Sequence, residues 1–104
     1  MDTAVTAAYN AGVFVAVAAG NEGVDASNKS PARAPAVMTV GATDISDVRP
    51  VWSNFGSLVD IHAPGVNVLG AWIGSGNNWY NTISGTSMGT CPYCFGDESM
   101  IEIC

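Results

Sequence analysis

Positively charged side chains are scarce in this sequence of 104 residues. Lys29, Arg33 and Arg49 are its only lysines and arginines, against nine acidic residues, and the formal net charge is −6. Binding to nucleic acid depends on neutralising phosphates with Lys and Arg. The composition therefore argues against a nucleic-acid partner, and it disfavours an anionic membrane surface for the same reason.

Long hydrophobic runs are also missing. The longest run covers residues 11–19, far short of the roughly 20 apolar residues that a transmembrane helix needs. Met1 is followed by Asp2 and not by a basic and then an apolar segment, so no secretory signal is visible. Cysteine is absent before the last 14 residues. An odd-numbered cluster at the end of a chain defines no disulfide framework.

Charged residues make up only 12% of the chain and hydrophobic residues 48%. A disordered chain has the opposite composition, so we expect a folded chain of one domain. The hydrophobic share also exceeds what a small domain, with its large surface, normally requires. This richness favours a piece of a larger hydrophobic core.

The order of apolar and polar segments predicts an α/β fold. Residues 2–10 are rich in alanine and suit a short helix, which Gly12 would end. Residues 13–20 form a continuous apolar run, typical of a strand buried on both faces of a parallel sheet. A long polar loop follows, and later apolar runs predict strands at 37–43, 58–65 and 66–72, with a hairpin-like tip at 75–81.

Four motifs follow one another along the chain: VAVAAGNEG (15–23), SPARAPAVMTVGATD (30–44), WSNFGSLVDIHAPG (52–65) and SGTSM (84–88). Together they resemble the C-terminal half of the catalytic domain of subtilisin-like serine proteases, in particular the proteinase K-like group of fungi. The resemblance implies a partial subtilisin-like fold, incomplete, with a mostly parallel sheet and flanking helices. It also implies serine endopeptidase activity on polypeptides, and secretion. Residues 1–88 would form the partial peptidase domain and residues 89–104 a divergent tail.

Ser87 matches the nucleophile of that family, and Asn21 matches its oxyanion-hole asparagine. The glycine-flanked turn before Ser87 would deliver the serine to the first turn of a helix, where backbone N–H groups lack intrahelical acceptors. Without the other motifs, the favoured interpretations would be a helix N-cap for Ser87 and an Asx-turn residue after a strand for Asn21. Ala18, Ala19 and Gly20 resemble the wall of the primary specificity pocket, where small residues leave room for a large apolar side chain.

Asp60, with the backbone carbonyls of Pro35 and Val37, matches a calcium site of the proteinase K-like group. One carboxylate and carbonyl oxygens suit a hard cation, and water would complete the shell. The alternative is that Asp60 caps a strand end or pairs with Arg33 or Arg49. The resemblance implies no organic cofactor.

The Asp and His of the family's catalytic triad precede the segment matched here, so we expect this chain to lack them. Its one histidine is His62, which we interpret as a strand side chain and not as a catalytic base. The chain would then carry only the nucleophile and oxyanion side of the site and be inactive by itself. The alternative is a non-catalytic fragment of a degraded or misread protease gene. It would self-associate, or bind a complementary fragment, through the apolar edge of the strand at 13–19, which lacks a neighbour strand on one side.

The tail departs from the family pattern directly after Met88. Gly89, Pro92 and Gly96 are poor helix formers, so the helix that follows Ser87 should be short or absent. The tail cysteines, Cys91, Cys94 and Cys104, admit two further readings: a zinc set with His62, or a redox pair at the first two. Both patterns are incomplete, and accidental cysteines remain the simplest interpretation.

Overall fold

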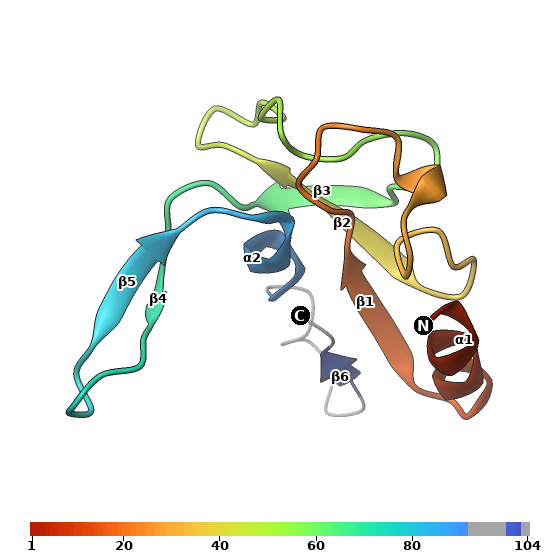
Figure 1. The fold of residues 1–104 in the computed structure, drawn as a ribbon, viewed down its shortest axis with the longest axis horizontal. Helices are drawn as coiled ribbons and strands as arrows, with labels where there is room; N and C mark the ends of the chain where they lie inside the picture. Colours follow the sequence, from red (N-terminus) through yellow and green to blue (C-terminus); the bar gives the residue numbers. More distant parts are fainter. Residues whose placement is uncertain (92–99, 103–104) are drawn as a thin grey trace.

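The computed structural model describes residues 1–91 and 100–102. A four-stranded, all-parallel sheet carries one helix on each face, and a separate two-stranded antiparallel hairpin projects from it (Figure 1). The elements in chain order are α1 (Asp2–Asn10), β1 (Phe14–Ala18), the 3₁₀ turn η1 (Ala26–Asn28), β2 (Met38–Thr43), β3 (Ile61–Pro64), β4 (Val68–Ala71), β5 (Tyr80–Ile83), α2 (Thr86–Thr90) and β6 (Met100–Glu102).

The α/β prediction and the largely parallel sheet are confirmed. The first helix and the first buried strand lie where the sequence predicted them, and Gly12 between them has φ of +89°, a conformation that glycine adopts without strain. The sheet order is β3-β2-β1-β6. β1 ends at Ala18, and the loop that follows this strand contains Asn21.

The two faces of the sheet are covered differently because side chains alternate along each strand. Val15 and Val17 of β1 pack with Val5 of α1 in the hydrophobic core, together with Ala34 and Val37. The opposite face of the sheet is contacted by α2, which touches β1, β2 and β3. A Cβ on Gly89 of α2 would lie 3.1 Å from Ala63 O and from Gly41 O, so a glycine at this position lets the short helix lie close to the strands.

Two predicted strands are shorter than expected. The strand predicted at 58–65 begins only at Ile61, because the preceding backbone makes a turn in which Val59 N donates to Gly56 O over 3.1 Å. The strand predicted at 66–72 covers Val68–Ala71, and Asn67 before it has φ of +53°. This strand does not join the parallel sheet but pairs antiparallel with β5, around the predicted hairpin tip.

The expected gap beside β1 is filled over part of its length. We predicted that β1 would lack a neighbour on one side, and this was wrong for its first residues: β6 pairs with it in parallel, with Phe14 opposite Met100 and Ala16 opposite Glu102. The pairing comes from the segment predicted to be a divergent tail, in which no pattern indicated a strand. Cys94 and Cys104, like Pro92 and Gly96, lie outside the described residues.

Candidate active site

Ser87 lies in the first turn of α2, at the carboxyl end of the parallel sheet. The chain before it is held to the end of β3, because Gly85 N donates to Gly65 O over 2.8 Å. The two backbones approach so closely that a Cβ on Gly65 would lie 2.7 Å from Gly85 O. Ser87 itself is half-buried. The predicted shortness of the helix is confirmed within the described residues, since α2 has five residues.

Asn21 follows β1 and is joined to the residue before Ser87. The Thr86 backbone N–H and the Thr86 hydroxyl both donate to Asn21 Oδ1, each over 2.9 Å, and Gly20 N donates to Thr86 Oγ1 over 3.1 Å. Thr86 is fully buried. Because both Thr86 groups bind the carbonyl oxygen of the Asn21 amide, the amide nitrogen is turned away from Thr86.

Two nitrogen donors converge beside Gly85. The point that a Cβ on Gly85 would occupy lies 3.8 Å from Asn21 Nδ2 and 3.9 Å from the Ser87 backbone nitrogen. The Ser87 N–H belongs to the first turn of a helix, where N–H groups have no intrahelical acceptor. The structure therefore brings Asn21 and Ser87 together, as the sequence predicted. Met88 Sδ borders the same point at 3.4 Å.

The segment 18–20 leads from β1 into this site, and Gly20 has φ of +105°. Ala19 is buried, whereas Ala18 and Gly20 are half-buried. A Cβ on Gly20 would lie 2.4 Å from Asn54 Nδ2, so only glycine fits this close approach. The role of the segment as a specificity-pocket wall stays a prediction.

Asn54 is a residue of the site that the sequence analysis missed. Its side chain is fully buried, and its Oδ1 accepts hydrogen bonds from Glu22 N at 3.1 Å and Val24 N at 3.0 Å. Its Nδ2 donates to Ala19 O at 2.8 Å and to Glu22 Oε2 at 3.0 Å. Asn54 belongs to the motif WSNFGSLVDIHAPG (52–65), and nothing in that motif marked the asparagine as buried.

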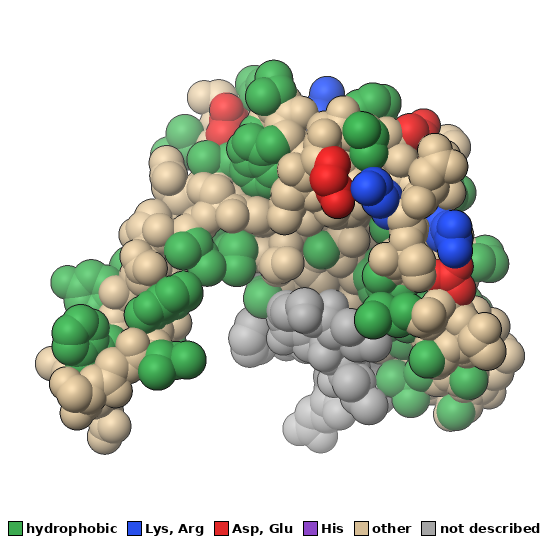
Figure 2. Space-filling view, in the orientation of Figure 1, with side chains coloured by type: hydrophobic (Ala, Val, Ile, Leu, Met, Phe, Trp, Pro, Cys, Tyr) green, Lys and Arg blue, Asp and Glu red, His purple; other side chains and the backbone are tan. Residues whose placement is uncertain are grey.

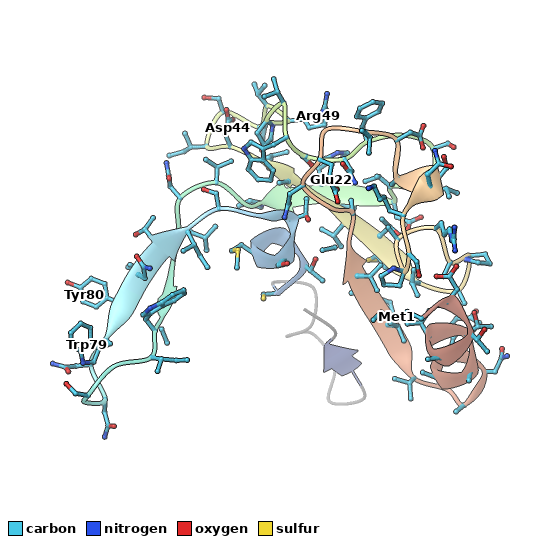
Figure 3. All side chains as sticks on the ribbon, viewed as in Figure 1. Met1, Glu22, Asp44, Arg49, Trp79 and Tyr80 are labelled. Atoms are coloured by element: carbon cyan, nitrogen blue, oxygen red, sulfur yellow. The ribbon has the colours of Figure 1, made fainter. Side chains whose placement is uncertain are left out.

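The acidic side chain next to Asn21 remains ionised at neutral pH. The hydrogen bond from Asn54 and the Lys29 ammonium, 3.4 Å from Glu22 Oε1, hold the pKa of the Glu22 carboxyl below its ordinary value. Figure 3 shows Glu22 beside the loop that leaves the carboxyl end of β1.

His62 lies in β3, as expected, on the face of the sheet opposite to α2. Its ring covers Gly41, where a Cβ would lie 2.5 Å from the ring carbon Cδ2. Ala42, which follows Gly41 in β2, points to the other face of the sheet. Its Cβ lies 2.8 Å from the place that a Cβ on Gly65 would occupy, and that place is 2.7 Å from Gly85 O. His62 is thus separated from Ser87 by the sheet.

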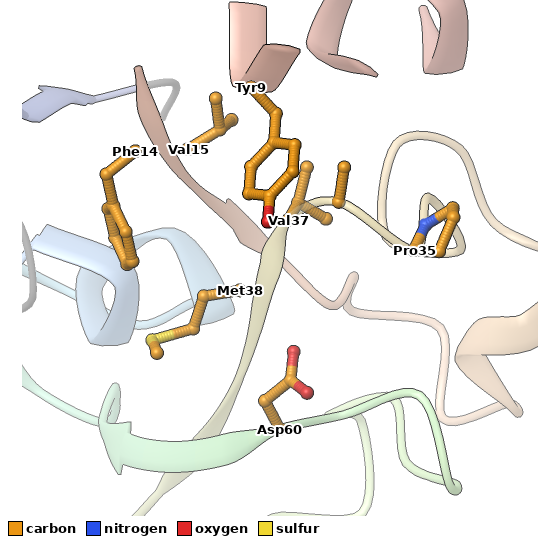
Figure 4. A pocket seen from close by; sticks show the side chains of 8 residues that line it. Tyr9, Phe14, Val15, Pro35, Val37, Met38 and Asp60 are labelled. Atoms are coloured by element: carbon orange, nitrogen blue, oxygen red, sulfur yellow. The ribbon is translucent and has the colours of Figure 1, made fainter. Parts of the chain in front are cut away.

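Asp60 lies in one shallow hollow with Pro35 and Val37, and Figure 4 shows its carboxylate directed into that hollow. Asp60 Oδ2 accepts a hydrogen bond from Thr39 N over 2.8 Å, so the expected strand-end contact is present. The alternative ion pairs are not formed in the described part of the chain. Arg33 Nε instead lies 2.7 Å from Asp2 Oδ2, and Arg49 donates to Ser53 O.

The chemistry of this donor set fits a calcium ion in part. Pro35, Val37 and Asp60 all line this hollow, and carboxylate and backbone carbonyl oxygens are the ligands that calcium prefers. Among residues 1–91 and 100–102, no group of three His, Cys, Asp or Glu side chains could hold a metal ion. Any cation beside Asp60 would therefore also need carbonyl and water oxygens as ligands. Of the three cysteines in the suggested zinc set, only Cys91 lies within the described residues.

The described helices are all too short or too polar to cross a membrane.

The family model described as "Subtilase family" matches residues 1–92 of the chain. The chain belongs to the subtilase family. Alkaline protease 1 of Aspergillus clavatus is 58% identical over 95 residues, which are 91% of this chain and 23% of that protein. Subtilisin-like protease 2 of Pseudogymnoascus destructans is 56% identical over 96 residues, 92% of this chain and 24% of the relative.

A solved structure shows the same subtilase fold. The crystal structure of a cold-adapted subtilisin-like serine proteinase matches with a TM-score of 0.80 and 52% identity, covering 86% of this chain and 32% of that one. This confirms the partial subtilisin-like fold. The chain spans about a quarter of the length of these curated relatives, and the division at residue 88 stays a prediction.

Proposed function

We propose that this subtilase chain carries the nucleophile and oxyanion side of a serine endopeptidase site. The single observation that supports this most is the convergence of Asn21 Nδ2 and Ser87 N on one point beside Gly85. Names of relatives such as "Alkaline protease 1" support the reaction class. The substrate would be a polypeptide, with a large apolar side chain against the wall formed by Ala18, Ala19 and Gly20.

In this reaction Ser87 Oγ attacks the scissile carbonyl carbon and loses its proton to a base. The carbonyl oxygen becomes an oxyanion, which would accept hydrogen bonds from Asn21 Nδ2 and the Ser87 N–H. The amine then leaves with the proton, and water later hydrolyses the acyl-enzyme. Losing one oxyanion donor costs about 3–4 kcal/mol of transition-state stabilisation, a magnitude measured in a subtilisin and carried over here.

The base must come from elsewhere, because the one histidine of these 104 residues lies across the sheet from Ser87. By itself the chain would retain only the residual acceleration of a site without its triad, about 10³–10⁴ over water. A second subtilase segment that supplies the Asp and His motifs would complete the centre.

The test is complementation. The chain is mixed with the part of a fungal subtilase that carries the Asp and His motifs, and hydrolysis of an apolar peptide ester is followed. We expect hydrolysis from the mixture only, and its loss with Ser87→Ala. Ser57→Ala, a change at an exposed serine, serves as the matched control. Equal hydrolysis with Ser87→Ala and Ser57→Ala would refute the proposal.

Two further parts of the account rest on the same family. Secretion follows from the resemblance, and recovery of the full-length gene product from the culture medium would test it. A calcium ion between Asp60, Pro35 and Val37 would stabilise the fold without taking part in the reaction. The ion would link the loop before β2 to the start of β3.

A second candidate function is self-association of this chain without catalysis. The hairpin of β4 and β5 favours it, because hydrophobic side chains gather along its surface (Figure 2) and Trp79 and Tyr80 project from its far end (Figure 3). The exposed fractions are 94% for Ile73 and 73% for Tyr80. Sedimentation velocity separates the candidates: a concentration-independent monomer, with hydrolysis on complementation, leaves only the first.

A further inference from the structure

We infer that Asn54 is a positioning residue of the oxyanion hole, acting on Asn21 through the loop 19–24. The inference rests on the proposed function of Asn21 and adds the element that fixes its place. Asn54 comes from the loop between β2 and β3, far from Asn21 in sequence. Its side chain is fully buried directly behind the loop.

The hydrogen bonds of Asn54 bracket Asn21 on both sides. Its Nδ2 binds the carbonyl of Ala19, two residues before Asn21, and its Oδ1 binds the N–H groups of Glu22 and Val24 after it. Its own backbone N–H donates to Gly20 O over 3.0 Å. One side chain therefore forms hydrogen bonds with three backbone groups of the loop that follows β1.

Thr86 and Asn54 hold the loop from opposite ends. Thr86 fixes the Asn21 side chain through Oδ1, whereas Asn54 fixes the backbone that carries it. The Asn21 side chain is exposed, so burial does not fix its place. If the backbone shifts, the amide nitrogen moves relative to Ser87 N, and a displacement of about 1 Å at a catalytic group can cost about 100-fold in rate.

Glycine at position 20 and glutamate at position 22 complete this arrangement. Gly20 leaves the space into which the Asn54 amide fits, since a Cβ there would lie 2.4 Å from Nδ2. Glu22 Oε2 accepts the second hydrogen of that amide over 3.0 Å. The donor side of the Asn54 amide therefore has two acceptors, and only an amide oriented in this way satisfies both.

The decisive variant is Asn54→Asp, which keeps the shape and the acceptor oxygen. It replaces the donor to Ala19 O and Glu22 Oε2 with a second oxygen, so both contacts become repulsive. In the complemented protease we expect kcat to fall between about tenfold and 100-fold. Asn28→Asp, the same change at an exposed asparagine of η1, is the control and should leave kcat unchanged.

A double-mutant cycle distinguishes positioning from general destabilisation. If Asn54 acts through Asn21, Asn54→Asp should change kcat by no more than about twofold once Asn21→Ala has removed the donor. An equal loss in both backgrounds would overturn the inference. Combining Asn54→Asp with Glu22→Gln should recover part of kcat, because the amide introduced at position 22 donates to the carboxylate introduced at position 54.

Hydrogen exchange of the chain alone gives a readout that needs no catalysis. In Asn54→Ala, which removes the oxygen that accepts from both groups, we expect faster exchange of the Glu22 and Val24 amides, with the amides of α1 unchanged. If Ser87→Ala leaves hydrolysis intact, the proposed function fails and with it the role of Asn54 in catalysis. Unchanged exchange at Glu22 and Val24 would instead overturn the anchoring by Asn54, whatever the activity.

Discussion

Asn21 Oδ1 accepts two hydrogen bonds from a single residue, Thr86, and both measure 2.9 Å. The contact joins the loop after β1 to the first residue of α2, which are 65 positions apart in sequence. It turns the Asn21 amide nitrogen toward the space beside Gly85 that Ser87 N also borders. One buried threonine thereby places Asn21 beside Ser87, the residues that we propose as oxyanion donor and nucleophile.

Replacing Thr86 with valine should destabilise the chain. The change keeps the shape of the side chain but leaves Gly20 N without its acceptor and removes one donor to Asn21. An unsatisfied buried polar group costs about 1–3 kcal/mol, and we expect a loss of that size in urea unfolding. Thr86→Ser keeps the hydroxyl and should lose distinctly less. Equal stability of Thr86→Val and the parent chain would contradict the role of the hydroxyl.

Gly20→Ala should cost more than Gly12→Ala. Both positions have positive φ, so both substitutions impose backbone strain of about 1–3 kcal/mol. A Cβ on Gly12 meets nothing within 4 Å, whereas one on Gly20 lies 2.4 Å from the Asn54 amide and 2.7 Å from Glu22 Oε2. Thermal unfolding of the two variants checks this, and similar Tm values would show that Asn54 does not crowd Gly20.

Acid should weaken the contact between α1 and the loop before β2. Hydrogen bonds from Ser30 and Arg33 hold the pKa of the Asp2 carboxyl below its ordinary value. A pKa lower in the folded than in the unfolded state stabilises the fold above the unfolded pKa, and this stabilisation disappears as the pH falls through the folded pKa. We expect Asp2→Asn to flatten the pH dependence of unfolding below about pH 4.

The matched control for that experiment is Asp47→Asn. Asp47 is exposed and forms no ion pair within the part of the chain that the structure describes. Its variant should keep the parent's pH dependence. If the free energy of unfolding varied with pH in the same way for Asp2→Asn and the parent, the Asp2 contacts would not persist in solution.

Calcium should raise the Tm of the parent chain, and chelation with EDTA should lower it again. A ligand at about 100 times its Kd stabilises the folded state by about 2.7 kcal/mol. Asp60→Asn should abolish the response, because it removes the one carboxylate of the site but keeps an oxygen for the Thr39 N–H. A calcium response that survives Asp60→Asn would place the ion elsewhere.

Much of this architecture could be predicted from local sequence. The unbroken apolar run of β1, with β-branched Val15 and Val17, is typical of a strand buried on both faces. Gly12 and the turn residues around the hairpin tip marked where elements end. Ser87 and Asn21 were found because their motifs resemble a known family, and the structure brings the two together.

The remainder depends on contacts that no local pattern encodes. The pairing of β6 with β1 joins residues more than 80 positions apart, and no local pattern in residues 100–102 predicted a strand there. Asn54 lies in a polar turn, where an asparagine is normally exposed, and its burial follows only from the way the loop of Asn21 folds over it. Side-chain anchors of this kind become visible only once the strands are placed.

The most direct test of the central claim is the covalent labelling of Ser87. The complemented protease is treated with a fluorophosphonate, in which the serine oxygen forms a bond to phosphorus and fluoride leaves, and the site is mapped by peptide mass spectrometry. The account predicts one adduct, on Ser87, formed far more slowly in Asn21→Ala. An adduct on another serine, or labelling of Ser87 that does not respond to Asn21→Ala, would contradict it.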